Sequence, residues 1–142
     1  MLVKEIMTPG VVSVTPDDTI GDAARLMSAY NVGALPVCGD AGEVRGMITD
    51  RDLTTRCVAA DYSPETTRVG SVMTRTVIAV EQRADVREAS QLMAQHRVRR
   101  LPVLDNGRLC GMVSLGDIAT QGRFDMEASR ALTEISQPRR GS

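Results

Sequence analysis

Two short segments of the sequence place a hydroxyl and a carboxylate at the same spacing, Thr49-x-x-Asp52 and Ser114-x-x-Asp117. A carboxylate can accept hydrogen bonds from both hydroxyl groups of a cis-diol. A hydroxyl beside the unpaired N–H groups that begin a helix is suited to phosphate. The same spacing is also that of a capping box, which stabilises the start of a helix and does nothing more. We therefore expect a ligand contact, a helix cap, or both at these four residues.

Arginines accompany the second of these segments much more than the first. Arg99 and Arg100 precede one Leu-Pro pair, whereas Gly33 and Ala34 precede the other, and the first segment itself contains Arg51. An arginine pairs with phosphate oxygens through two parallel hydrogen bonds and keeps its charge. The sequence therefore predicts an asymmetric site, in which Arg99 and Arg100 hold most of a phosphate. The alternative is a solvated basic turn without a ligand.

The remaining reactive residues do not favour an enzyme. His96 is the only histidine, which argues against a histidine-based triad or a multi-histidine metal site, and we expect it at the end of a helix. No Ser, Cys or Lys has an activating base at a recognisable spacing. The cysteines, Cys38, Cys57 and Cys110, include no C-x-x-C pair and are predicted to be reduced thiols, with Cys57 in the core.

Composition places the chain among ordinary globular domains. Its 142 residues are 42% hydrophobic and 25% charged, and the formal net charge of -1 provides no basic field for nucleic acid. No apolar run approaches the ~20 residues that span a bilayer, and the first ten residues do not resemble a secretory signal. We expect a cytoplasmic protein that binds neither nucleic acid nor membrane. The core is expected to consist mainly of aliphatic residues and methionine, since aromatic residues are 2% of the chain.

An internal duplication organises the sequence. Residues 4–53 align with residues 70–118: IMT matches VMT, VGALPV matches VRRLPV, and GMITDRDL matches GMVSLGDI. Such self-similarity indicates two copies of one structural unit, each too small to bury a core alone. We predict a first repeat over residues 1–60, a linker over 61–69, a second repeat over 70–122, and an extension over 123–142. That extension should form a short helix over 126–135 and then a frayed tail.

Each repeat is predicted to be β-α-β-β-α. Capping boxes at Thr19-x-x-Asp22 and Asp85-x-x-Glu88 open two helices with one apolar face each, the first through Ile20, Ala23, Ala24 and Met27. The predicted strands are 11–14, 35–37, 44–48, 101–104 and 109–113, with the Leu-Pro strands at a sheet edge or a strand start. The second helices are predicted over 50–60 and 115–122.

The repeat and its closing pattern G-h-h-[ST]-x-x-D-h resemble the CBS domain, and the tandem pair resembles a Bateman module. The resemblance covers about residues 2–120 and is greatest to small stand-alone two-CBS proteins of bacteria and archaea. It implies an α/β (α+β) fold of two β-α-β-β-α repeats, packed pseudo-symmetrically, sheet against sheet. It also implies a regulatory protein that needs no cofactor and binds AMP, ADP, ATP or S-adenosylmethionine in clefts between the repeats.

The resemblance assigns roles to residues of both repeats. Asp52 and Asp117 would bind the ribose hydroxyls, and Thr49 and Ser114 would meet the phosphate. The adenine ring would lie among the following residues: Val12, Leu35, Pro36 and Met47 of the first repeat, and Ile78, Leu101, Pro102 and Met112 of the second. Ala34 is also expected to contact the ligand.

Self-association is the other expectation. Similar modules bury helical faces against a second copy as a flat disc, and the second helices here carry Leu53, Val58, Ala59, Ile118 and Ala119 among polar residues. A closed two-fold dimer is the commonest way to cover such faces. The competing hypothesis for function is therefore a dimeric adaptor with empty ligand clefts, which acts on an unknown regulated protein. A monomer with scattered surface aliphatics is the simpler alternative.

Overall fold

The chain folds into two compact units that do not coincide with the two sequence repeats. The structure, a computed structural model, describes residues 1–121 and 125–137, and for residues 125 and 126 the backbone only. Unit 1 comprises residues 1–11 together with 78–142, and unit 2 comprises residues 12–77. Each unit therefore contains most of one repeat and the first few residues of the other. The fold class is α+β, as the sequence predicted.

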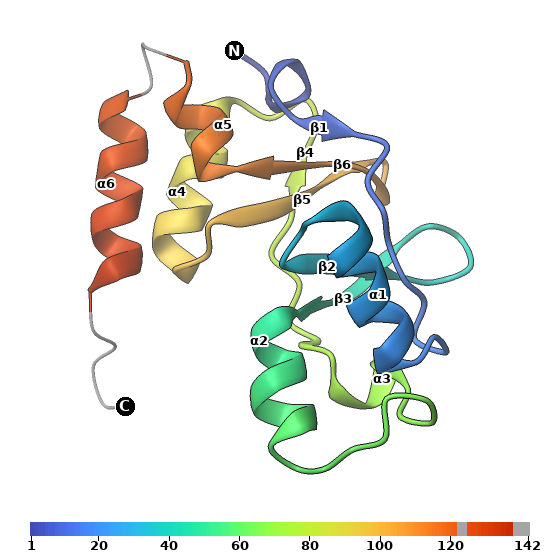
Figure 1. The fold of residues 1–142 in the computed structure, drawn as a ribbon. Coiled ribbons are helices and arrows are strands. Elements are labelled where there is room, and N and C mark those ends of the chain that lie inside the picture. The colour runs from blue at the N-terminus through green and yellow to red at the C-terminus, as the bar shows by residue number, and fades with distance from the viewer. Residues whose placement is uncertain (122–124, 138–142) are drawn as a thin grey trace. The chain divides into compact units, whose positions relative to one another are not determined.

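Unit 2 consists of a two-stranded antiparallel sheet and helices, shown in blue to green in Figure 1. Its elements are α1 (Ile20–Tyr30), β2 (Ala34–Cys38), β3 (Val44–Thr49), α2 (Asp50–Asp52), η2 (Leu53–Val58) and α3 (Val69–Val72). Here η2 is a π-helical continuation of α2. The buried core includes Val14, Ile20, Met27, Leu35 and Ile48.

Unit 1 contains a four-stranded sheet in the order β1-β6-β5-β4. Its elements are η1 (Val3–Glu5), β1 (Thr8–Pro9), β4 (Val80–Glu81), α4 (Val86–His96), β5 (Arg100–Asp105), β6 (Arg108–Ser114), α5 (Leu115–Ala119) and α6 (Asp125–Ser136). Val3, from the start of the chain, is fully buried in the same core as Met93, Leu101 and Ile118. The N-terminal segment is therefore an integral part of unit 1.

The helices α1 and α4 each begin at a side chain that accepts a backbone N–H of the first turn. The hydroxyl of Thr19 accepts the N–H of Asp22, whose carboxylate in turn accepts the N–H of Thr19, both at 3.1 Å. At α4 the carboxylate of Asp85 accepts the N–H of Arg87 at 2.8 Å, so this cap uses a different partner from the predicted Glu88. His96 is the last residue of α4, as predicted.

Several predicted boundaries were wrong. Residues 11–14 do not form a regular strand, because only Val14 reaches β2, where it donates to the carbonyl of Pro36 and accepts from Cys38. The second helix of each repeat is shorter than predicted: η2 ends at Val58 and α5 ends at Ala119. Ala24 is exposed on α1. Ile118, which was expected at a dimer interface, is fully buried in the core of unit 1 and is not available for one.

The proline in each Leu-Pro strand lies where no ladder donor is needed. Pro36 is opposite Met47, whose backbone N–H and C=O are bonded to Thr74 on the far side of β3. The pair Pro36–Met47 therefore exchanges no hydrogen bonds, and the carbonyl of Pro36 faces Val14. Pro102 occupies the same register opposite Met112, but in β5, which is an interior strand of its sheet. The prediction of an edge position is wrong for Pro102.

The C-terminal helix α6 packs alongside α4 and α5, as Figure 1 shows. Its buried residues are small, Ala128 and Ala131, and Ile135 packs partly against the core. An ion pair joins Glu127 to Arg87 of α4 at 3.6 Å. The helix predicted over 126–135 is thus confirmed, while the predicted frayed tail at 138–142 lies outside the described residues.

Candidate functional site

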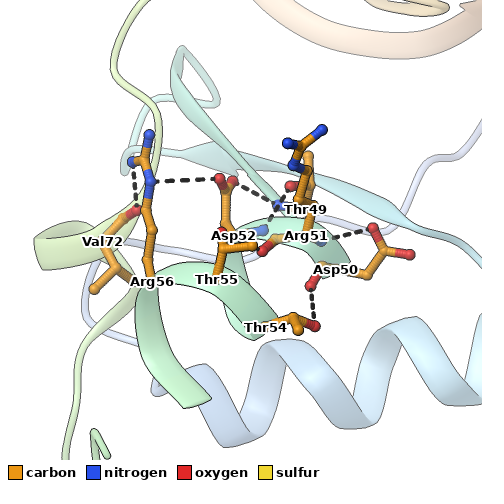
Figure 2. Close-up of polar contacts among 8 residues, drawn as sticks. All are labelled: Thr49, Asp50, Arg51, Asp52, Thr54, Thr55, Arg56 and Val72. Atoms are coloured by element: carbon orange, nitrogen blue, oxygen red, sulfur yellow. Dashed lines mark hydrogen bonds and ion pairs between the residues drawn. The ribbon is translucent and has the colours of Figure 1, made fainter. Parts of the chain in front are cut away.

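Both hydroxyl–carboxylate segments form reciprocal helix caps. The hydroxyls of Thr49 and Ser114 accept the N–H groups of Asp52 and Asp117 at 3.0 Å, and one oxygen of each carboxylate accepts the N–H of the hydroxyl residue. Figure 2 shows this arrangement for Thr49 and Asp52. The capping role weighed from the sequence is therefore present in the structure. It occupies only one oxygen of each carboxylate and does not test the ligand role.

The second carboxylate oxygen differs between the two repeats. In Asp52 it lies 3.7 Å from Nε of Arg56, and Nη1 of the same arginine donates to the carbonyl of Val72, as Figure 2 shows. In Asp117 the corresponding oxygen makes no hydrogen bond or ion pair with the described part of the chain. Asp52 is also the more buried of the two. Asp117 is therefore the carboxylate with more free capacity for a ligand hydroxyl.

Unit 1 contains a pocket of about 820 Å³ between the start of β5, the end of β6, and helices α5 and α6. Its lining residues are Arg99, Arg100, Ser114, Leu115, Gly116, Ala119, Ala128, Ser129 and Leu132. Strand pairing places Arg100 opposite Ser114, and the carbonyl of Arg99 accepts the N–H of Leu115 at 2.8 Å. Neither arginine side chain pairs with a carboxylate among the described residues. Two exposed arginines thus line one pocket without a counter-ion from the described chain.

The pocket gathers three of the predicted ligand residues, Arg99, Arg100 and Ser114, and leaves the others outside its lining. Asp117 is not a lining residue, although its carboxylate accepts the N–H of the lining residue Ser114 at 2.8 Å. Leu115 and Ala119 are one turn apart on the pocket side, whereas Asp117 lies about 200° around the helix from Leu115. Outside the lining, Pro102 is buried in β5, while Ile78 and Met112 are half-buried.

The predicted residues of the first repeat lie in unit 2 and have a different electrostatic setting. Asp50 occupies the position that Leu115 has in the second repeat, and its carboxylate oxygen lies 3.1 Å from where a Cβ on Gly33 would be. An acidic group therefore stands beside the residue that replaces Arg99. Arg51 is exposed. The other predicted ligand contacts there are half-buried or buried: Val12, Ala34, Leu35, Pro36 and Met47.

Sequence reasoning missed the contribution of α6. Ala128, Ser129 and Leu132 form one wall of the pocket, and they lie beyond the duplicated region. The available signal was the i, i+4 spacing of Ala128 and Leu132, which indicates a shared helix face. It does not indicate which surface that face contacts.

The cysteines lie apart from the pocket lining. Cys57 and Cys38 are buried, and Cys110 is half-buried in β6. Burial raises the pKa of each of the three thiols. At Cys57 the carboxylate of Asp52 raises the thiol pKa further. Cys57 is therefore a core residue, as predicted, and its environment disfavours the reactive thiolate.

Comparison with known families explains the duplication. The CBS domain model matches this sequence twice, over residues 3–58 and 69–121. The chain belongs to the CBS-domain family. The CBS protein YhcV of Bacillus subtilis is 43% identical over 134 residues, which cover 94% of each chain. Hypoxic response protein 1 of Mycobacterium tuberculosis is 38% identical over 116 residues, which cover 82% of this chain and 81% of the relative.

Solved CBS structures share the fold. The crystal structure of hypoxic response protein I, described with two coordinated zinc ions, has a TM-score of 0.79 and 36% identity over 85% of this chain and 98% of that one. A CBS-CP12 protein from cyanobacteria, described as hexameric, has a TM-score of 0.74 and 30% identity over 85% of this chain and 67% of its own. In the present CBS protein, residues 1–121 and 125–137 include no group of three or more His, Cys, Asp or Glu placed to hold a metal. None of its described helices combines the length and the apolar character that crossing a membrane requires.

Proposed function

We propose that this CBS protein is a non-catalytic sensing module that binds an adenine nucleotide through its second repeat. The observation that carries the proposal is the convergence of Arg99, Arg100 and Ser114 on one pocket. Arginine and hydroxyl groups together form a suitable phosphate site, and this one faces no acidic lining residue. The sequence singled out the same three residues for phosphate.

The second repeat also offers the better ribose contact. One oxygen of Asp117 is uncommitted among the described residues, whereas the corresponding oxygen of Asp52 lies beside Arg56. The adenine contacts of this proposal are Ile78, Pro102 and Met112, the residues that the CBS resemblance implies. We therefore propose one nucleotide for each chain, bound at the second repeat.

A regulatory role suits the chemistry better than catalysis. His96 ends α4, and Cys57 is buried with a raised thiol pKa. In each repeat one carboxylate, that of Asp52 or Asp117, accepts a backbone N–H, which suits a helix cap or a ligand contact. These features favour a protein that reports ligand occupancy to an unknown partner, without turnover.

A ligand screen tests the proposal. Thermal unfolding is measured with AMP, ADP, ATP and S-adenosylmethionine, because a ligand at 100 times its dissociation constant adds roughly 2.7 kcal/mol to stability. Calorimetry with the stabilising nucleotide then gives stoichiometry, and Asp117→Ala should weaken binding. No shift with any of the four ligands would contradict the proposal, and two equivalent sites for each chain would contradict the assignment to one repeat.

A dimeric adaptor is a second candidate, favoured by one observation. Tyr30, Val58 and Tyr62 are exposed apolar or aromatic side chains of unit 2, with Val58 70% exposed. A second copy of the chain would cover them, and a CBS protein described as hexameric is among the structural relatives. In this reading the exposed residues of unit 2 form the interface, and the pocket of unit 1 needs no ligand.

A further inference from the structure

The pocket of unit 1 has two chemically different sides. Its cationic residues are Arg99 and Arg100, at the start of β5, and most of the other lining residues come from α5 and α6. Its total volume of about 820 Å³ falls within the range of small-molecule sites, roughly 300–1,000 Å³. Such a division suits a ligand that itself has one anionic end and one apolar part.

The side formed by the helices is largely apolar. Leu115 and Ala119 contribute from α5, and Ala128 and Leu132 from α6. Leu132 remains 43% exposed, although Ala128 and Ala131 on the same helix are buried. A ligand that covers apolar surface otherwise in contact with water is bound more tightly for that reason. Leu132 is therefore positioned to contribute to binding when the pocket is filled.

The corresponding positions of the first repeat have the opposite character. Asp50 replaces Leu115, and Thr54 replaces Ala119, with the Thr54 hydroxyl donating to the carbonyl of Asp50 at 3.0 Å, as Figure 2 shows. Gly33 replaces Arg99. The first repeat thus has an uncharged residue in place of the arginine, and an acidic and a polar residue in place of Leu115 and Ala119. The combination of arginines and apolar residues belongs to the second repeat alone.

We infer that the pocket of unit 1 binds organic phosphates through their apolar part as well as their charge, with α6 as the specificity-determining wall. The phosphate pairs with Arg99 and Arg100, and the apolar body lies against Leu115 and Leu132. The inference rests on the proposed function for its use of the arginines as the phosphate site. It differs from it because the binding requires no ribose and no contact with Asp117.

The test uses three probes that separate charge, apolar body and ribose. Inorganic phosphate carries the charge alone, 1-naphthyl phosphate carries charge and an apolar ring, and AMP adds the ribose. Dissociation constants are measured by calorimetry, and for the naphthyl compound also by its fluorescence. Wild-type protein should bind 1-naphthyl phosphate more tightly than inorganic phosphate by at least about 10-fold, because only the former covers the apolar wall.

Matched variants identify the residues responsible. Arg99→Ala combined with Arg100→Ala should weaken 1-naphthyl phosphate at least about 10-fold, since charge-assisted hydrogen bonds are lost. Leu132→Ala should weaken it roughly 3- to 10-fold and leave inorganic phosphate unchanged. The controls are Arg130→Ala and Thr133→Ala, which change exposed residues of α6 outside the pocket lining and should leave all three affinities unchanged.

The outcomes separate this inference from the proposed function. AMP binding that depends on Asp117, together with no binding of 1-naphthyl phosphate, would overturn the inference and leave the nucleotide proposal intact. Binding of 1-naphthyl phosphate that depends on Leu132, without binding of AMP, ADP, ATP or S-adenosylmethionine, would support the inference and contradict the nucleotide proposal. Equal losses of affinity for 1-naphthyl phosphate in Leu132→Ala and Thr133→Ala would overturn the role of the α6 wall. An unchanged affinity in both variants would overturn it as well.

Discussion

Gly46 lies directly against the backbone of Thr74: a Cβ atom on Gly46 would come within 2.6 Å of the Thr74 carbonyl oxygen. The neighbouring residue Met47 exchanges two backbone hydrogen bonds with Thr74, both 2.9 Å long. Gly111 has the same relationship to Thr8 in unit 1, at 2.8 Å. The Met-Thr segment that begins one repeat thus packs on the Gly-Met strand of the other. The two repeated motifs, Met-Thr and Gly-Met, therefore contact each other in both units.

Substitution of either glycine should destabilise the protein. Gly46→Ala and Gly111→Ala each force a methyl group into a backbone carbonyl, which is overpacking with an expected cost of about 1–3 kcal/mol. Gly116→Ala is the control, because the nearest atom to its Cβ would be 3.6 Å away and alanine favours the helix. Urea unfolding monitored by circular dichroism measures all three. An unchanged midpoint for Gly46→Ala would show that the Thr74 segment moves away at little cost.

The pairing of each Met-Thr segment with a strand of the other repeat could not be predicted from the sequence. The duplication, the two long helices and the α+β class followed from motif identity and 3.6-residue periodicity. Periodicity carries no information about which copy a short segment pairs with, so the location of Thr8 on β6 and of Thr74 beside β3 was not predicted. The choice depends on tertiary packing, in which Val3 fills the core of unit 1.

The candidate site was predictable in part for a related reason. Arg99, Arg100 and Ser114 stood out because their charge and spacing differ from the first repeat, and they line one pocket. Leu132 lies outside the duplication, and its part in the pocket depends on how α6 packs against α5. The helix itself was predictable from local sequence, but its docking surface was not.

The two caps should differ in their contribution to stability. Asp52→Ala removes a buried carboxylate that accepts the Thr49 N–H and lies beside Arg56, so we expect a loss of about 2 kcal/mol. Asp117→Ala removes a single cap and should cost about 1 kcal/mol. Chemical denaturation of both variants in ligand-free buffer measures the difference. Equal losses would mean that the contact with Arg56 contributes nothing.

Removal of Arg99 and Arg100 should lower the affinity for a nucleotide and leave the affinity for the nucleoside nearly unchanged. The double variant Arg99→Ala, Arg100→Ala should bind AMP at least about 10-fold more weakly, while adenosine affinity changes little, because the lost hydrogen bonds are charge-assisted. Calorimetry with both ligands measures the two affinities. Arg130→Ala removes the same type of charge from α6 outside the pocket and is the matched control. A parallel loss for AMP and adenosine would indicate that the arginines maintain the fold or an interface.

Thiol labelling should follow burial. Alkylation requires the thiolate, and burial raises the thiol pKa of all three cysteines, which lowers the thiolate fraction at neutral pH. Cys110 is half-buried whereas Cys38 and Cys57 are buried, so iodoacetamide should modify Cys110 first. Mass spectrometry of timed digests gives the order, and modification of all three should accelerate in urea. Early labelling of Cys57 in native buffer would contradict its assignment to the core.

The proposed dimer predicts that a charge introduced at an exposed apolar residue of unit 2 separates the copies. Val58 is 70% exposed at the end of η2, and Tyr30 and Tyr62 are exposed in the same unit. If a second copy covers Val58, Val58→Asp buries an unpaired carboxylate in the interface, which is costly enough to shift the equilibrium to monomer. Light scattering at micromolar concentrations should then give a mass near 15.3 kDa for the variant and twice that for the wild type.

The control for this prediction is Gln95→Asp, which adds the same charge at an exposed position of α4 and should remain dimeric. A wild-type mass of 15.3 kDa would reject the dimer, and a dimeric Val58→Asp would place the interface elsewhere.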